Sequence, residues 1–305
     1  MYFTSIPNHK DPTFDEELHF SQFKQRNIIF NVKAERAYCE QLKGFLSIKM
    51  VSSGEEWYRI NNQELAVRPD QFLILNDEQD YTCRVDSPKD VRIQSIFFTK
   101  TFSSAVFRDA LSDEEMMLDA PYEQGQSLEF FQTLYRTDEV LRQKISRLIS
   151  MLDDHVHRAD WVDEHLVFLL QYLIGVHKNE VKRVRDVKAL KPATRKEIYK
   201  RLCIAKDFMH SSFTSDADLS QIGGSACLST PQLVRQFKAV FEITPHQYLL
   251  QVRLENALSL LKNSTLTVQE ITWRCGFENA SAFCRAFKSR YGHSPLHFRA
   301  GEILN

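Results

Sequence analysis

The most informative part of the sequence reads Leu219-Ser-Gln-Ile222-Gly223-Gly224-Ser-Ala-Cys227-Leu228-Ser229, followed by Leu233-Val234-Arg235-Gln236-Phe237-Lys238. A second stretch has the same pattern: Val268-Gln-Glu-Ile271-Thr272-Trp-Arg-Cys275-Gly276-Phe277, then Phe283-Cys284-Arg285-Ala-Phe287-Lys288. Ile222, Cys227 and Leu228 have counterparts 49 residues later, and Leu233, Arg235 and Phe237 have counterparts 50 residues later. Each copy has the spacing of a helix-turn-helix. Two copies in series predict a protein that reads DNA rather than an enzyme.

The residues inside each copy fit what a helix-turn-helix requires. The first helix packs closely across the second, so it needs a small residue at the crossing, and Gly223 and Thr272 stand there. The turn needs glycine or another small residue, and Cys227 and Gly276 stand there. We therefore expect the two units at about residues 217–238 and 265–288, with Leu233, Phe237, Phe283 and Phe287 packed inside.

The other faces of the two second helices are the candidate DNA-contacting surfaces. They carry Thr230, Pro231, Gln232, Val234, Arg235 and Lys238 in the first copy, and Asn279, Ser281, Cys284, Arg285 and Lys288 in the second. Arg can donate to both O6 and N7 of guanine, and Asn or Gln can pair with adenine in the same two-point way. Lys238, Lys288 and Arg290 are better placed for phosphate. Either arginine could instead be a scaffold residue held in a salt bridge.

The first hundred residues predict a β-rich domain. Residues 27–98 contain short apolar or aromatic runs, separated by turn signals at Ser52-Ser53-Gly54 and at Asn61-Asn62. This pattern is typical of a β-sandwich or a small barrel. Helical spacing follows over about residues 100–177, with apolar faces at Leu128, Phe131, Leu134 and Tyr135, at Leu141, Ile145, Leu148, Ile149 and Leu152, and at Leu166, Leu169, Leu170, Leu173 and Ile174. These faces either pack on the barrel or pair with a second chain in a homodimer.

Charge and composition suggest a division of the chain into two domains. Residues 195–305 hold 14 Lys and Arg against 9 Asp and Glu, while residues 1–194 hold 25 against 31. A basic half joined to an acidic half is typical of a polyanion-binding domain attached to a regulatory domain. Between them lies a cation-rich stretch with few apolar residues. We expect a sensor and dimerisation domain over 1–180, a linker over 181–194, and a DNA-binding domain over 195–305.

The six cysteines form no CxxC pair. Reduced thiols in a cytoplasmic protein explain them best, because the sequence shows no electropositive surroundings that would favour a redox sensor. The chain has no apolar run of eighteen residues and no basic start followed by a long apolar segment. We therefore expect neither a membrane partner nor a signal peptide, and a cytoplasmic, nucleoid-associated location.

The second copy and the residues after it carry a family resemblance. The run from Phe283-Cys284-Arg285-Ala-Phe287-Lys288 through Tyr291-Gly292-His-Ser294-Pro295 to Phe298-Arg299 resembles the signature of the AraC/XylS family of transcription regulators. The resemblance implies an all-α domain of about seven helices that binds double-stranded promoter DNA and activates through RNA polymerase. It places base-reading residues at Pro231, Val234 and Arg235, and at Ser281, Cys284 and Arg285. Gly223 and Thr272 replace the family's usual alanine, and the glycine implies a weaker, more mobile first unit.

The N-terminal part resembles the cupin-like sensor domain of the same family through Gly54-Glu55 and the run Pro69–Leu75. The expected fold is therefore α+β, with a cupin-like β-barrel and dimerisation helices before the all-α domain. A small-molecule effector would lie inside the barrel. Trp57, Tyr58 and Tyr81 are candidate ligand contacts, although they could equally be core aromatics.

Enzymatic interpretations lack the residues they need. A metal-binding cupin requires clustered histidines, and residues 27–98 contain no histidine. No glycine-rich phosphate loop or nucleophile motif is present. We therefore expect no enzymatic activity, no cofactor and no metal. Two alternatives stay open: a ligand-binding protein whose helical C-terminal domain is a partner platform, and a cupin-type enzyme fused to DNA-binding helices.

Overall fold

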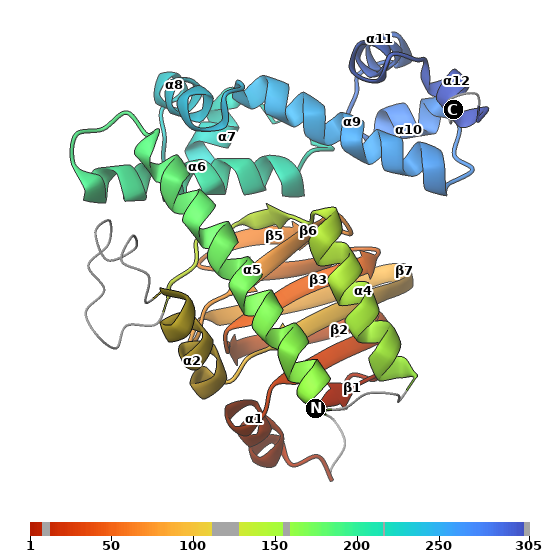
Figure 1. Cartoon of the computed structure of the whole chain (residues 1–305). Coiled ribbons are helices and arrows are strands. Elements are labelled where there is room, and N and C mark those ends of the chain that lie inside the picture. Colours follow the sequence, from red (N-terminus) through yellow and green to blue (C-terminus); the bar gives the residue numbers. More distant parts are fainter. Residues whose placement is uncertain (8–12, 112–127, 155–158, 216, 302–305) are drawn as a thin grey trace. The chain divides into compact units, whose positions relative to one another are not determined.

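A computed structural model of the chain describes residues 1–7, 13–111, 128–154, 159–215 and 217–301. The chain forms two compact units, Met1–Lys182 and Arg183–Asn305 (Figure 1). The first unit is built around a β-sheet and the second is helical, so the chain has the mixed α and β character that the sequence predicts.

The sheet of the first unit contains eight strands in the described part of the chain. They are β1 (Tyr2–Phe3), β2 (Ile28–Lys43), β3 (Ser47–Ser53), β4 (Glu56–Ile60), β5 (Gln63–Val67), β6 (Gln71–Leu75), β7 (Asp80–Phe97) and β8 (Leu134–Arg136). The order is β1-β2-β7-β3-β6-β8, with the β4–β5 hairpin joined to β7 through β4. Only the β1–β2 pair is parallel among these pairings. Closure of this sheet into a cupin-like barrel stays a prediction.

Both turn signals of the sequence are confirmed. Gly54 lies between β3 and β4 with a φ of 76°. Asn61 and Asn62 join β4 to β5 with φ values of 48° and 64°. A two-residue hairpin loop with two positive φ values matches the right-handed twist of its strands, and asparagine tolerates this conformation better than most residues.

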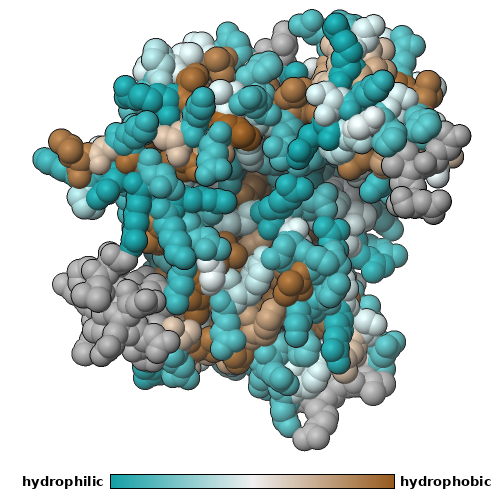
Figure 2. All heavy atoms as spheres, turned by 45° about the horizontal axis from the view of Figure 1, so that its top comes forward, coloured by the Kyte–Doolittle hydropathy of each residue, from teal (hydrophilic) through white to brown (hydrophobic). Residues whose placement is uncertain are grey.

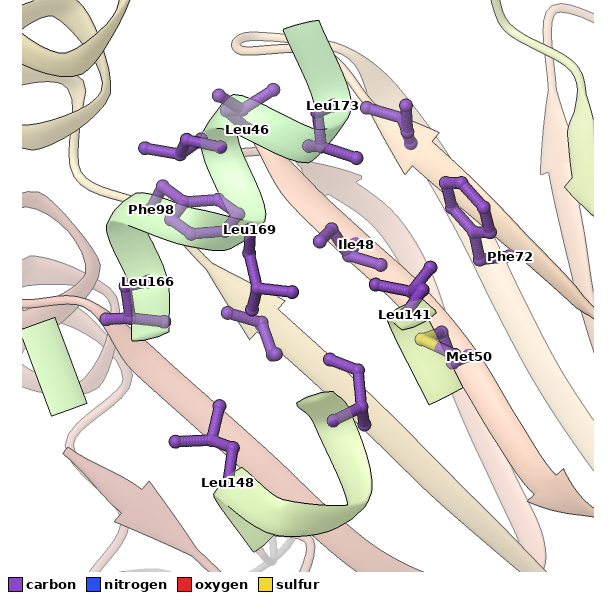
Figure 3. Packing of buried hydrophobic residues seen from close by; sticks show 14 of the residues in the cluster. Leu46, Ile48, Met50, Phe72, Phe98, Leu141, Leu148, Leu166, Leu169 and Leu173 are labelled. Atoms are coloured by element: carbon purple, nitrogen blue, oxygen red, sulfur yellow. The ribbon is translucent and has the colours of Figure 1, made fainter. Parts of the chain in front are cut away.

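One face of the sheet packs against two helices, α4 (Glu139–Asp153) and α5 (Ala159–Arg185), as Figures 1 and 3 show. Leu46, Ile48, Met50 and Phe72 of the sheet side meet the leucines of the helices in one buried cluster. The helix residues in this cluster are Leu141, Ile145, Leu148, Ile149, Leu152, Leu166, Leu169, Leu170, Leu173 and Ile174. The apolar faces that suggested helix pairing with a second chain are therefore covered within the chain. A homodimer through other residues stays a prediction.

The opposite face of the sheet meets α1 (Glu16–Gln25), and α2 (Lys100–Leu111) follows the last residues of β7. Phe23 of α1 packs in an aromatic cluster with Phe97, Phe30 and Phe45. Side chains alternate across a strand. Lys49 of β3 and Phe97 of β7 consequently point to this face, while Ile48 and Ile96 point toward α4 and α5.

The prediction of a helix at Leu128, Phe131, Leu134 and Tyr135 is wrong. Residues 128–133 are irregular and Leu134–Arg136 form β8, which pairs with β6 through Phe72 opposite Tyr135. All four residues are nonetheless buried, so apolar content was present without helical geometry. A short apolar run is ambiguous between helix and strand, and pairing with the free edge of β6 settles it. Positions 112–127 and 155–158 of the predicted helical region lie outside the described residues.

The second unit contains α6 (Pro192–Ser211), α7 (Leu219–Ser225), α8 (Thr230–Phe241), α9 (Pro245–Asn263), α10 (Val268–Arg274), α11 (Ala280–Tyr291) and α12 (Pro295–Arg299). Four of them begin with proline in the first turn, where the missing N–H is not needed by the helix. Thr244, Thr267, Asn279 and Ser294 are N-caps whose side chains accept a backbone N–H, a role that their residue types favour.

The irregular connection between α5 and α6 covers residues 186–191. It is shorter than the linker predicted over 181–194, because α5 continues to Arg185 and Pro192 begins α6. Proline is tolerated at the first helical position, although it would interrupt a helix further in.

Candidate nucleic-acid interface

The first helix-turn-helix unit is α7 followed by α8. Asp218 caps α7 and forms a reciprocal capping box with Gln221, with hydrogen bonds of 2.7 and 3.0 Å. The chain then turns through Cys227, whose φ of 52° lies in the left-handed region. Ser229 is the N-cap of α8, and Pro231 occupies its first turn. The local sequence therefore fixes both ends of the turn between the two helices.

The second helix-turn-helix, α10 followed by α11, is built in the same way. Thr267 and Glu270 form the capping box of α10, with hydrogen bonds of 2.7, 2.8 and 3.2 Å. Gly276 makes the turn with a φ of 75°. The predicted equivalence of Cys227 and Gly276 is therefore confirmed in the backbone, since both positions require a conformation that favours glycine.

One backbone hydrogen bond recurs inside the two turns. The N–H of Leu228 donates to the carbonyl of Gly223 at 2.9 Å, and the N–H of Phe277 donates to the carbonyl of Thr272 at 3.0 Å. The four residues predicted to pack the second helices, Leu233, Phe237, Phe283 and Phe287, are each 0% exposed. Both units thus bury the same face of their second helix and leave the opposite face outside.

Seven of the eleven predicted DNA contacts are exposed: Pro231, Arg235, Lys238, Asn279, Ser281, Arg285 and Lys288. Thr230, Gln232, Val234 and Cys284 are half-buried. Within the part of the chain that the structure describes, no hydrogen bond or ion pair holds Arg235 or Arg285. The scaffold role considered for these arginines has no support there. The face seen in Figure 2 is mainly hydrophilic, and its hydrophobic residues lie in small groups.

Asn279 has a structural role that limits its value as a DNA contact. Its side-chain carbonyl accepts the N–H of Ala282 at 2.8 Å and caps α11. A two-point contact to adenine needs that same carbonyl together with the amide N–H. The cap constrains the orientation of this carbonyl, which can still accept a second hydrogen bond, so the adenine contact stays a prediction. Arg285 and Ser281 are the better candidates in this unit.

Gln236 is a structural residue of the first helix-turn-helix that the sequence pattern did not reveal. It lies on α8 with 2% exposure, between Arg235 and Phe237. Its side-chain oxygen accepts the N–H of Lys188 at 3.0 Å, and its side-chain nitrogen donates to the carbonyl of Lys188 at 3.1 Å. This side chain ties α8 to the connection that precedes α6. Its helical spacing from the buried Leu233 and Val240 is the signal in the sequence that could have indicated this role.

The β-sheet unit, Met1–Lys182, holds a second candidate site. It is a cavity between α1 and the face of the sheet opposite α4 and α5. It encloses about 820 Å³, its open mouth included, and most of its lining is apolar. Its wall includes Cys39, Lys49, Glu56 and Cys83, each of which can carry charge or react. The ring of Phe97 lies 3.7 Å from Lys49 Nζ, and the Tyr58 hydroxyl donates to Glu56 Oε2 at 2.7 Å.

Burial changes the acidities of two of these groups. It raises the pKa of Glu56 to about 7 and lowers the pKa of Lys49 to about 8. Each charge opposes the shift of the other, but loss of water is the larger cause in both. Ionisable groups with shifted pKa values inside an apolar cavity are typical of binding sites.

The predicted ligand contacts divide between the two sides of the sheet. Tyr58 and Tyr81 line the cavity with 1% and 6% exposure. Trp57 is not among the cavity-lining residues, because successive residues of β4 point to opposite faces. Its indole N–H donates to Glu55 at 3.0 Å, and the Arg84 guanidinium lies 5.5 Å from its ring centre. The sequence missed Lys49 and Glu56, whose proximity depends on how the strands pair.

In the described ranges, no three His, Cys, Asp or Glu side chains are grouped so that they could hold a metal ion. The helices within those ranges also include none with the length and apolar character needed to cross a membrane.

Comparison with known proteins places the helical unit, Arg183–Asn305, in a class. Residues 223–301 match a family model described as a helix-turn-helix domain. The chain is 35% identical over 100 residues to the Msm operon regulatory protein of Streptococcus mutans, covering 33% of this chain and 36% of that protein. It is 23% identical over 170 residues to the HTH-type transcriptional activator RhaS of Escherichia coli, covering 55% and 58%. The chain thus matches less than two thirds of the length of these relatives. A structure of ToxT from Vibrio cholerae covers 90% of this chain and 97% of its own at 15% identity and a TM-score of 0.35.

The two matched helix pairs and their exposed basic faces define a DNA-binding domain of the kind found in transcription regulators. Residues 223–301 therefore form a helix-turn-helix domain of the AraC type, similar to the domains of the regulators named above.

Proposed function

We propose that the protein is a sequence-specific regulator that binds promoter DNA with α8 and α11. The observation that supports this most directly is the agreement between the two helix-turn-helix motifs. Both have a left-handed turn residue and a buried inner face, and both expose an arginine at the matched position, Arg235 or Arg285. A structural helix pair would not need the same exposed arginine twice.

In this proposal Arg235 and Arg285 read guanine in successive stretches of the major groove. Their guanidinium groups can donate to O6 and N7, and none of the described residues occupies those donors. Lys238 and Lys288 lie one helical turn further along and contact phosphate, which fixes the position of each helix without reading sequence. Val234 and Pro231 supply apolar contact to thymine methyl groups or sugars.

The same proposal includes activation through RNA polymerase and control by a small molecule. Similarity to a relative named as a transcriptional activator supports the first part. The cavity under α1 supports the second, because an apolar space whose wall includes buried ionisable groups such as Lys49 and Glu56 can bind a small effector. We further propose that the protein acts as a homodimer, since paired half-sites are common among DNA readers.

The test is DNA binding by the full-length protein over a range of salt concentrations. A regulator that contacts several phosphates loses affinity steeply with salt, with a slope near 0.9 on logarithmic axes per phosphate contacted. A selected sequence should also bind at least about a thousandfold more tightly than random duplex. Weak affinity with no dependence on salt or sequence would contradict the proposal and favour the partner-platform alternative.

A further inference from the structure

Two cysteines that are far apart in the sequence face each other in the sheet. Cys39 on β2 pairs with Cys83 on β7, and the antiparallel register places them directly opposite. Ala37 and Val85 are opposite each other two positions away, so the two strands are in step there. Opposed residues have Cβ atoms about 4.5–5.5 Å apart. A disulfide needs about 3.5–4.5 Å, a difference that a small local adjustment of the strands can supply.

The strands can adjust at this place. The pairing of β2 and β7 shifts register between Cys39 and Leu42, which is the mark of a bulge. A bulge interrupts the regular ladder of hydrogen bonds and permits local bending. The pair therefore lies beside an irregular part of the sheet rather than in its rigid centre.

Both thiols line the cavity. Cys39 and Cys83 are half-buried and belong to its wall, so a small solute that enters the mouth can reach them. By contrast, Cys203 and Cys275 are buried, which removes them from contact with such a solute. Cys227 is exposed on the second unit and Cys284 is half-buried. The cavity pair thus combines access with a ready partner.

Two charged groups of the cavity wall act on the thiols in opposite directions. Glu56 disfavours their thiolate form, and the ammonium group of Lys49 favours it by a smaller amount. The hydrogen bond from the Cys83 thiol is the main reason that the pKa of Cys39 is lowered to about 7, whereas the pKa of Cys83 is raised. The other ionisable groups in the wall are His19, Lys43, Tyr58 and Tyr81. Cys39 is therefore the thiolate of the pair at neutral pH, and the thiolate is the reactive form.

We propose that Cys39 and Cys83 form an oxidation site at which a small hydroperoxide converts the two thiols into a reversible disulfide. The Cys39 thiolate attacks one peroxide oxygen and breaks the O–O bond, giving a sulfenic acid and, with hydrogen peroxide and a proton, one water. Cys83 then attacks the Cys39 sulfur, and the hydroxyl group leaves with the Cys83 proton as a second water. Two thiols are oxidised by two electrons, and one peroxide is reduced to two waters.

The disulfide would alter the cavity wall. It joins β2 to β7 covalently and removes the hydrogen bond between the two sulfurs. It also leaves Lys49 without the adjacent negative charge of the Cys39 thiolate. This inference does not depend on DNA binding, so its failure and the failure of the proposed function can be observed separately.

The experiment treats full-length protein carrying Cys227→Ser, which removes the exposed thiol, with an equimolar amount of hydrogen peroxide. Remaining thiols are alkylated, and the protein is digested without reduction and analysed by mass spectrometry. We expect one peptide pair linked through Cys39 and Cys83, and its disappearance after dithiothreitol. The rate of formation should rise with pH about a midpoint near 7, the pKa of Cys39.

Two variants make the test decisive. In Cys83→Ser the first step proceeds without the second, so a sulfenic acid should accumulate at Cys39 and react with dimedone. The control Cys284→Ser should form the linked pair at the rate of the parent protein. Oxidation spread equally over Cys39, Cys83 and Cys284 would overturn the proposal. So would absence of the linked peptide in protein whose Cys39 alkylates readily before treatment.

Discussion

Gly223 lies so close to Leu228 that a Cβ atom built on the glycine would stand 2.6 Å from the carbonyl oxygen of Leu228. This contact is at the crossing of α7 and the turn that leads into α8. The sequence predicts Gly223 as the small residue at this crossing, and the close approach agrees with that prediction. The structure separates Gly223 from Gly224, since a Cβ on Gly224 would meet nothing within 4 Å.

Substituting the two glycines should therefore have opposite effects. Gly224→Ala should raise the free energy of unfolding by about 0.5–1 kcal/mol, because alanine loses less conformational freedom in a helix. Gly223→Ala gains the same term but must push the Leu228 carbonyl away, so we expect a net loss of stability. Thermal unfolding of the two variants beside the parent measures the difference. Equal stabilisation by both would show that the turn yields easily.

Gln236→Leu should destabilise the helical unit, Arg183–Asn305, by about 1–3 kcal/mol, because it leaves the backbone N–H and carbonyl of Lys188 without their partner. Leucine has a similar size, so the loss reports on hydrogen bonding more than on packing. Gln232→Leu, on the same helix but half-buried, is the matched control and should change stability much less. Urea unfolding supplies the values.

The pH dependence of stability should reveal Glu56. Burial raises its pKa to about 7, from an ordinary value of 4.5, so between these pH values the folded protein keeps a proton that the unfolded chain has released. Stability contributed by this group therefore falls as pH rises from about 4.5 to 7. Glu56→Gln cannot titrate and still accepts the Tyr58 hydrogen bond. Its stability should decline less than that of the parent across this window. Parallel curves for the two proteins would contradict the assignment.

Lys288→Ala should weaken binding to all DNA sequences by a similar factor and reduce the salt slope by about one phosphate contact. Lys288 is exposed in the last turn of α11, where a cation can reach the backbone of the duplex. Lys262→Ala removes the same charge from the last turn of α9 and should have a smaller effect. A loss confined to one base position would instead make Lys288 a base-reading residue.

The sequence predicted the helical unit well, because the signals that determine its helices are local. Capping residues, prolines in first turns and apolar spacing act within a few residues, and the repeat showed each of them twice. Thr267 with Glu270 and Ser294 with Pro295 are examples of such local signals in the structure. Asn279 shows the limit of this reasoning, since its residue type suits both a cap and an adenine contact, and only geometry distinguishes them.

The β-sheet unit was harder to predict, because the residues of its cavity are brought together by pairing between distant strands. Cys39 and Cys83 are brought together only by the register of β2 and β7, and Lys49 reaches them from a third strand. Nothing near Leu134 in the sequence indicates that β6 has a free edge for it to pair with. The helical prediction there consequently failed, while the burial of the same residues was already implied by their apolar character.

Each helix-turn-helix is expected to read its own block of bases. Selection of random duplex DNA should therefore be carried out with the full-length protein and with Arg235→Ala and Arg285→Ala. The parent should recover two short blocks about one helical turn apart. Each variant should lose preference at one block only, at a cost of about 1–3 kcal/mol for the affected base pair. Recovery of an unchanged two-block site by both variants, or of no site by the parent at any salt concentration, would contradict the account.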